Sequence, residues 1–236
     1  MIHSFDSYKN KHLGERCFIL GNGPSLKDEN LSLLSNENVF LVNRGYFALD
    51  IGLDHYDYYV LTDLRVYSED AEEIRSKSKF PRFYSSLIEN NSNYIKGVKE
   101  DYIPIKKFED KDKRKMSLYR NSFPTSFDDG WGKARTVVFD AALTAFFMGF
   151  KEIYFLGVDL TSPSDQETHF YGTGIREQRL RKDFTSKTDS FRSLINNFNL
   201  FFKSCNVKFI NLSKGFKHKE LMETSTLEDI INEKSI

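Results

Sequence analysis

The sequence predicts an α/β fold in which a mostly parallel sheet carries helices on both faces. Two observations lead to this prediction. Short apolar runs alternate along the chain with longer amphipathic or apolar segments, as they do where parallel strands are joined by crossover helices. The length of 236 residues suits one large domain, which would bury roughly 70% of its unfolded surface. No repeat or linker divides the chain, so we expect a single domain spanning residues 1–236.

The apolar runs give the expected strands, and the segments between them give the helices. Strands are expected at residues 16–20, 38–42, 56–62, 82–85, 152–158 and 207–211. Helices are expected at residues 24–34, 64–76, 134–148 and 189–204, with a last short helix at 226–232. That last helix has Ser225 and Glu228 at the spacing of a capping box.

The predicted helix at 189–204 covers one face of the sheet. Its apolar residues recur at spacings of three and four, which makes one apolar stripe with a polar reverse side. The residues of this stripe are Phe191, Leu194, Ile195, Phe198 and Phe202.

The helix predicted at 134–148 is apolar on nearly every side and ends at Gly149, a favourable residue just after a helix. We expect it to be the central, buried helix. Its N-terminus, in "GWGKART", should point towards the ligand site, which makes Arg135 and Thr136 candidate binding residues.

Composition limits the function. The chain has 34 basic and 34 acidic residues, and this balance argues against a nucleic-acid partner. No apolar stretch is long enough for a membrane span or resembles a signal peptide, so we expect a cytoplasmic protein. Cys17 and Cys205 lie in or beside apolar runs and are expected to be buried thiols. No histidine, cysteine or carboxylate spacing indicates a metal site.

The stretch "CFILGNGPSLKDENLSLL" runs from a strand through a glycine-rich turn into a predicted helix. Gly21 and Gly23 permit a tight turn and a close approach of backbone N–H groups to a ligand. Asn22 offers its amide, and the Ser25 hydroxyl can donate to phosphate at the helix start. The turn matches neither the dinucleotide fingerprint nor a Walker loop. The alternative is a tight turn with no ligand.

The third predicted strand ends with Thr62 and Asp63 in "VLTDLR". These side chains could hold a ribose or acceptor hydroxyl, or they could cap the next helix, a position for which both residue types are suited. We favour the cap.

Several segments resemble, in order, the bacterial sialyltransferases of glycosyltransferase family 42 and the related Maf flagellin glycosyltransferases. Archaeal 6-hydroxymethylpterin diphosphokinases share this broader Rossmann-like fold family. The similar segments are "FILGNGPSLKD" at 18–28, "VFLVNRGYF" at 39–47, "RTVVFDAALTAFFMGFKEIYFLGVDL" at 135–160, "HFYG" at 169–172 and "VKFINLS" at 207–213.

The resemblance implies roles for particular residues. Asn22 and Asn43 match asparagines that contact the sugar nucleotide, and both follow strand ends on the side where such sheets bind ligands. The alternative for Asn43 is a capping or turn asparagine. Arg44 is a candidate phosphate partner or a solvated arginine. Asp159 matches a recurring aspartate, for which we favour ligand contact over a structural role.

The polar segment 161–187 is expected to be a lid-like loop. It carries Tyr171, which the resemblance implies donates to the departing phosphate, and Arg176, which could add positive charge. The family's catalytic histidine is replaced here by Thr173, while His169 matches an upstream histidine. We predict that His169 takes the base role; the alternative is a structural histidine.

The resemblance implies a metal-independent glycosyltransferase without a cofactor. Its donor would be a CMP-linked sialic, pseudaminic or Kdo-type sugar acid, and its acceptor a bacterial surface glycan or a protein. Association with the inner face of the membrane and a homo-oligomer stay open. The alternatives are a pterin-type diphosphokinase, which would need ATP and Mg²⁺ near Asp63 and Asp159, and a non-catalytic nucleotide-binding partner in glycan assembly.

Overall fold

The computed structural model describes residues 4–79, 81–85, 88, 102–105, 136–160, 168–172 and 188–233, of which 188–191 are described by their backbone alone. Within these residues the strands form one sheet with the order β5-β4-β3-β2-β1-β6-β7, and every neighbouring pair is parallel. The strands are β1 (Arg16–Leu20), β2 (Asn38–Val42), β3 (Tyr58–Leu61), β4 (Arg82–Ser85), β5 (Ile103–Ile105), β6 (Glu152–Leu156) and β7 (Lys208–Asn211).

The strands form where apolar runs can be buried on both sides. Successive residues point to opposite faces, and in β1 Cys17 and Ile19 join one core cluster while Phe18 and Leu20 join the other. All four side chains are fully buried. A sheet buried on both faces explains why its strands are continuous apolar runs with no polar alternation.

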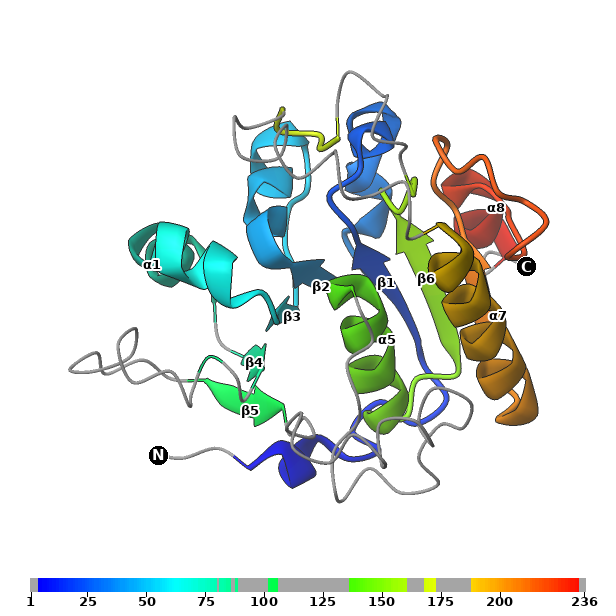
Figure 1. Ribbon diagram of the computed structural model, residues 1–236, viewed down its shortest axis with the longest axis horizontal. Coiled ribbons are helices and arrows are strands. Elements are labelled where there is room, and N and C mark those ends of the chain that lie inside the picture. Colours follow the sequence, from blue (N-terminus) through cyan, green and yellow to red (C-terminus); the bar gives the residue numbers. More distant parts are fainter. Residues whose placement is uncertain are drawn as a thin grey trace.

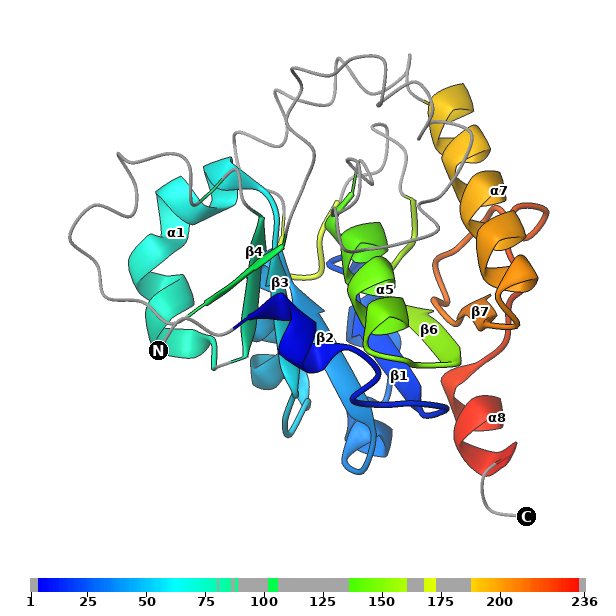
Figure 2. The same cartoon turned by 90° about the horizontal axis from the view of Figure 1, so that it is seen from below.

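Helices cover both faces, as the sequence predicted. On one face α5 (Val137–Phe147) lies over β1, β2 and β3 (Figure 1), and α7 (Thr188–Ser204) lies beside β7 (Figure 2). The other face is covered by the 3₁₀ helices η2 (Pro24–Asp28), η3 (Leu31–Leu34) and η4 (Asn43–Ile51), with α1 (Leu64–Lys77) and α8 (Leu227–Asn232). In Figure 2, α1 and α7 lie at opposite ends of the sheet. A further 3₁₀ helix, η1 (Phe5–Tyr8), packs on the α5 face.

The predicted helix at 24–34 is wrong, since two 3₁₀ helices occupy these residues. Glu29, between them, has an extended backbone, with φ −92° and ψ 143°. Its buried carboxylate turns inward and accepts a hydrogen bond from the Lys214 backbone N–H at 3.2 Å. This long-range contact competes successfully with local helix formation.

The predicted capping box is displaced by one residue. The Thr226 hydroxyl accepts a hydrogen bond from the Asp229 N–H at 3.1 Å and donates to the Asp229 carboxylate at 2.7 Å. Ser225 precedes the cap and donates its N–H to the Asn211 carbonyl at 3.4 Å. The chain therefore still runs beside β7 at the residue predicted to cap α8.

The sequence analysis missed β5 and η4. β5 is a three-residue edge strand with Pro104 at its centre, and proline is tolerated in a sheet at such an edge. Within the described residues, no helix is both long and apolar enough to cross a bilayer. The expected lid at 161–187 falls mostly outside the described residues.

Candidate active site

The strand order reverses between β1 and β6, because the chain proceeds outward from β1 to β5 and then returns to the other side of β1. Open α/β sheets bind ligands beyond the carboxyl ends of the strands at such a switch point. The turn after β1 (Gly21–Ser25) and the turn after β6 (Gly157–Asp159) meet there. We call these two turns together the locked turn.

Backbone hydrogen bonds join the two halves of the locked turn. The Gly21 N–H donates to the Leu156 carbonyl and the Gly23 N–H to the Gly157 carbonyl, each at 2.7 Å. Both glycine N–H groups, which the sequence analysis offered to a ligand, are therefore engaged within the protein.

The glycines are required here because the two turns are in close contact. A Cβ on Gly21 would clash with the Gly157 carbonyl oxygen and lie 2.8 Å from Val158 Cγ2. A Cβ on Gly23 would lie 2.5 Å from Asp159 Oδ2. Contacts this short require the backbone to move, so the glycine composition of the turn is explained by packing alone.

Asp159 and Ser25 bind each other inside the locked turn. The Ser25 N–H donates to Asp159 Oδ2 at 2.9 Å, and the Ser25 hydroxyl donates to Asp159 Oδ1. Burial raises the pKa of the Asp159 carboxyl, and the two hydrogen bonds from Ser25 oppose that rise. Gly215, from the loop after β7, packs against the same carboxylate. The Ser25 donors predicted to reach phosphate thus engage Asp159, and ligand contact by either residue stays a prediction.

The Asn22 side chain reaches the end of β2, where Asn43 follows the last strand residue. Asn22 Nδ2 donates to the Val42 carbonyl at 3.2 Å. The amide oxygen of Asn22 therefore points away from that carbonyl. Asn43 follows Val42 directly and has φ 48°, a left-handed conformation that asparagine tolerates better than most residues. We call Asn22 and Asn43 the asparagine pair.

The asparagine pair presents two unused acceptors. Asn22 Oδ1 and Asn43 Oδ1 are both shielded from solvent, and neither has a hydrogen-bond partner among the described residues. A buried acceptor without a partner costs about 1–3 kcal/mol. A ligand that brings hydroxyl or amino donors to these oxygens would offset that cost.

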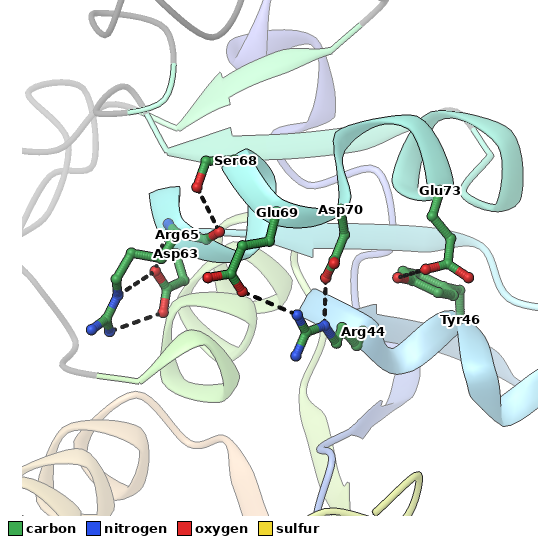
Figure 3. Close-up of polar contacts among 8 residues, drawn as sticks. All are labelled: Arg44, Tyr46, Asp63, Arg65, Ser68, Glu69, Asp70 and Glu73. Carbon is green, nitrogen blue, oxygen red and sulfur yellow. Dashed lines mark hydrogen bonds and ion pairs between the residues drawn. The ribbon is translucent and has the colours of Figure 1, made fainter. Parts of the chain in front are cut away.

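Arg44 is held by α1. Its guanidinium donates to the carboxylates of Asp70 and of Glu69, the latter at 3.3 Å (Figure 3). The predicted phosphate partner is therefore already paired with two carboxylates, and its contact with phosphate stays a prediction.

Thr62 and Asp63 follow β3, one strand further from the switch point. Asp63 is the N-cap of α1, since its side chain accepts from the Arg65 N–H at 2.9 Å. It also pairs with the Arg65 guanidinium at 3.2 Å. The capping role favoured by the sequence analysis is confirmed for Asp63, and Thr62 lies half-buried beside it.

His169 and Tyr171 are brought to the asparagine pair by the residue between them. The Phe170 N–H donates to the Asn22 carbonyl at 3.0 Å, and the Phe170 ring is buried in the core of the α1 face. The rings of His169 and Tyr171 stack with centroids 5.0 Å apart and planes 15° apart. These two residues, far from Asn22 in sequence, therefore flank a residue that is bonded to the Asn22 backbone.

Two residues that contact His169 or Tyr171 were not predicted from the sequence. Phe47 of η4 packs against Tyr171, with ring centroids 5.5 Å apart. Thr168 Oγ1 lies 3.1 Å from His169 Nδ1. When Nδ1 carries the proton and donates to Thr168, Nε2 keeps the lone pair that a base needs. The signals were present as an aromatic residue in "NRGYF" and a hydroxyl directly before the histidine.

The other predicted residues do not gather at one point. Thr136 is the N-cap of α5, and its side chain makes no capping hydrogen bond; Arg135, Thr173 and Arg176 lie outside the described residues. Asp63 and Asp159 follow β3 and β6, three strand spacings apart, or roughly 14 Å. They are too far apart to share one Mg²⁺. Elsewhere in the described chain, no three His, Cys, Asp or Glu side chains form a group that could hold a metal ion.

No protein-family model and no curated protein sequence matches this chain. Two solved structures of the sialyltransferase CstII from Campylobacter jejuni have a similar fold. One is a complex with the substrate analogue cytidine-5'-monophosphate, with a TM-score of 0.51 over 90% of this chain and 85% of that chain. The other is a complex with CMP-3FNeuAc, with a TM-score of 0.50 over 89% and 84%. Sequence identity is 16% in both.

A third similar structure is the MAf glycosyltransferase from Magnetospirillum magneticum AMB-1. It has a TM-score of 0.52 and 18% identity over 96% of this chain, which spans only 37% of that longer protein. These proteins are of the two kinds that the sequence motifs resemble, so the resemblance is confirmed for the fold.

Proposed function

We propose that this protein is a glycosyltransferase whose donor is a CMP-activated sugar acid of the sialic, pseudaminic or Kdo type. Two solved structures with a similar fold are complexes of a sialyltransferase with CMP or CMP-3FNeuAc. The observation in this chain that supports the proposal best is the asparagine pair, with two buried amide oxygens that have no partner among the described residues.

The chemistry of the asparagine pair suits a nucleoside. Amide oxygens accept hydrogen bonds, so they favour ribose hydroxyls or the amino group of cytosine over phosphate oxygens. The N–H groups of Gly21, Gly23 and Ser25 in the locked turn donate to acceptors within the protein. We therefore infer that the asparagine pair binds the nucleoside part of the donor, and that the phosphate is stabilised by other groups.

The stacked side chains of His169 and Tyr171 are proposed to catalyse the reaction. His169 Nε2 removes the proton from an acceptor hydroxyl as the hydroxyl oxygen forms its bond to the anomeric carbon. The bond from that carbon to the phosphate oxygen breaks, and CMP leaves with the electron pair. The Tyr171 hydroxyl donates a hydrogen bond to the departing phosphate, where such donors lower the barrier. The acceptor would be a bacterial surface glycan or a protein.

Thermal unfolding with a panel of nucleotides tests the binding half of the proposal. A ligand that binds only the folded protein stabilises it by about 2.7 kcal/mol at 100 times its Kd. We expect CMP to raise the Tm more than CDP, UDP, GDP or ATP, each measured with and without Mg²⁺. Stabilisation by ATP with Mg²⁺ alone would favour a diphosphokinase instead. The absence of any shift would favour a partner protein without catalytic activity.

Release of CMP from CMP-linked sugar acids tests the catalytic half. His169→Ala should lower turnover by about 100-fold or more and leave the CMP affinity nearly unchanged. His218→Ala is a matched control, because His218 is partly exposed and pairs with Glu220 at 3.5 Å, outside the proposed site. Equal turnover in both variants would contradict the base role of His169.

A further inference from the structure

Asn43 has an unfavourable backbone conformation and a buried, unpartnered amide oxygen. Both features cost free energy in the unliganded protein. An asparagine held in this way needs support from neighbouring elements. The Tyr59 hydroxyl, from β3, donates a hydrogen bond to the Asn43 carbonyl. The next residue along the chain, Arg44, extends to α1.

Arg44 connects Asn43 to α1 through two carboxylates. Its Nε donates to Asp70 and its Nη2 to Glu69. The Arg44 and Asp70 side chains are 23% and 16% exposed, whereas Glu69 is 35% exposed. The contact with Asp70 is thus the more buried of the two, and it should contribute more than an ion pair at the surface.

The backbone departs from helical geometry at both ends of this contact. Arg44 has φ −81° and ψ 15° inside η4. Asp70 has φ −121° and ψ 19° inside α1, which is interrupted there. Figure 3 shows the Asp70 side chain directed from this interruption towards Arg44. The irregular turn of α1 thus places the carboxylate that holds the residue following Asn43.

Two further contacts between α1 and η4 lie further along both helices. The Tyr46 hydroxyl donates to Glu73 at 3.4 Å (Figure 3), and the Lys77 ammonium lies 4.7 Å from the centre of the Phe47 ring. These contacts hold the middle of η4 against α1, whereas the Asp70–Arg44 contact holds the residue directly after Asn43.

We propose that Asp70 is a positioning residue that acts through Arg44 to hold the Asn43 carboxamide in place for the nucleoside. This inference rests on the proposed function for its ligand. It gives Arg44 a role different from a phosphate contact, because the guanidinium serves as the link between a carboxylate of α1 and the asparagine pair.

The test needs one measurement without ligand and one with it. The side-chain amide signals of Asn43 are followed by ¹⁵N NMR and assigned by their loss in Asn43→Gly. The Kd of CMP is measured by calorimetry. The variants are Asp70→Asn, Arg44→Gln, their double variant and Asp70→Glu, which retains the charge. Glu73→Gln is the matched control. It also removes a carboxylate from α1, but that carboxylate accepts a hydrogen bond from Tyr46 and not from Arg44.

We expect Asp70→Asn to shift or broaden the Asn43 amide signals and to raise the Kd of CMP about tenfold, as truncating one partner of a partly buried charge pair does. Arg44→Gln should have the same effect, and the double variant should lose no more than either single change. Asp70→Glu should recover most of the affinity. Glu73→Gln should leave both readouts unchanged.

Unchanged Asn43 signals in Asp70→Asn would overturn the proposal, and so would additive losses of CMP affinity in the double variant. An Asn43 signal that shifts while the Kd stays constant would also overturn it. If the wild-type protein does not bind CMP, the proposed function fails. The NMR readout then decides alone whether Asp70 positions Asn43.

Discussion

The turns after β1 and β2 lie side by side at the same edge of the sheet, yet their polar groups are used differently. In the locked turn, the N–H groups of Gly21, Gly23 and Ser25 all have protein acceptors. In the asparagine pair, two buried amide oxygens have no partner among the described residues. The contrast shows that close packing can account for the glycines of a turn at a switch point, while the unused acceptors lie in the side chains next to that turn.

The largest effect is expected when Gly21 is enlarged. Gly21→Ala should lower the free energy of unfolding by about 3 kcal/mol or more, because the new Cβ would clash with the Gly157 carbonyl. Urea unfolding measures the loss. Gly52→Ala is the control: Gly52 has φ 105° but open space around it, so its cost should be about 1 kcal/mol. Equal costs for the two variants would mean that the turns are not in tight contact.

The next largest effect is expected at Tyr171, in the candidate active site. Tyr171→Phe keeps the ring that stacks on His169 and packs on Phe47 but removes the hydroxyl. We expect turnover of a CMP-linked donor to fall about 100-fold, with the free energy of unfolding changed by less than about 0.5 kcal/mol. Tyr8→Phe, which removes a phenolic hydroxyl from η1, serves as the control. Full turnover in Tyr171→Phe would refute the phosphate contact.

The third prediction concerns Asp159 in the locked turn, whose contribution to the free energy of unfolding should depend on pH. Burial raises the pKa of Asp159, so the folded protein holds this proton more tightly than the unfolded chain, where the pKa is about 3.9. The stabilising contribution of Asp159 is then fully present below that value and falls as the pH rises through the folded-state pKa.

Asp159→Asn removes this titration. The stability difference between the wild-type protein and Asp159→Asn should therefore shift in favour of the variant as the pH rises from about 3.9, and then stay constant. Urea unfolding from pH 3 to pH 8 measures it, and groups shared by both proteins cancel in the difference. A difference that shifts towards the wild type with rising pH would contradict the raised pKa.

The smallest expected effect is at Thr168. Thr168→Val removes the oxygen that lies 3.1 Å from His169 Nδ1, so the imidazole loses about one hydrogen bond, worth roughly 1 kcal/mol. We expect turnover to fall about fivefold with unchanged CMP affinity, and Thr168→Ser to restore it. If the serine variant is as slow as the valine variant, the hydroxyl does not orient His169.

Sequence patterns predicted the sheet well because its strands are buried on both faces. Three of the predicted strands, residues 16–20, 38–42 and 82–85, coincide with β1, β2 and β4. The patterns failed where a distant contact decides the local conformation. Glu29 interrupts the predicted helix because it bonds Lys214, far away along the chain.

The sequence indicated several residues of the candidate site, but it did not indicate which other side chains they bond. Strand ends indicated Asn22 and Asn43, and a backbone hydrogen bond from Phe170 to Asn22 joins the segment of His169 and Tyr171 to the first of them. No local pattern could show that Asp159 binds Ser25, or that Arg44 is held by Asp70. Such pairings depend on which elements meet in the folded chain, so the predicted roles of Ser25, Arg44 and Asp159 as ligand contacts stay untested.

The most direct test of the account is a calorimetric titration of CMP into the wild-type protein and Asn43→Gly. Glycine adopts the left-handed backbone of Asn43 without strain, so this change removes the side chain with its carboxamide and leaves the backbone conformation accessible. We predict that the wild-type protein binds CMP and that the variant binds about 100-fold more weakly, or roughly 2.7 kcal/mol, while unfolding at nearly the same urea concentration. Equal affinity for CMP in both proteins would contradict the claim that the asparagine pair holds the nucleoside.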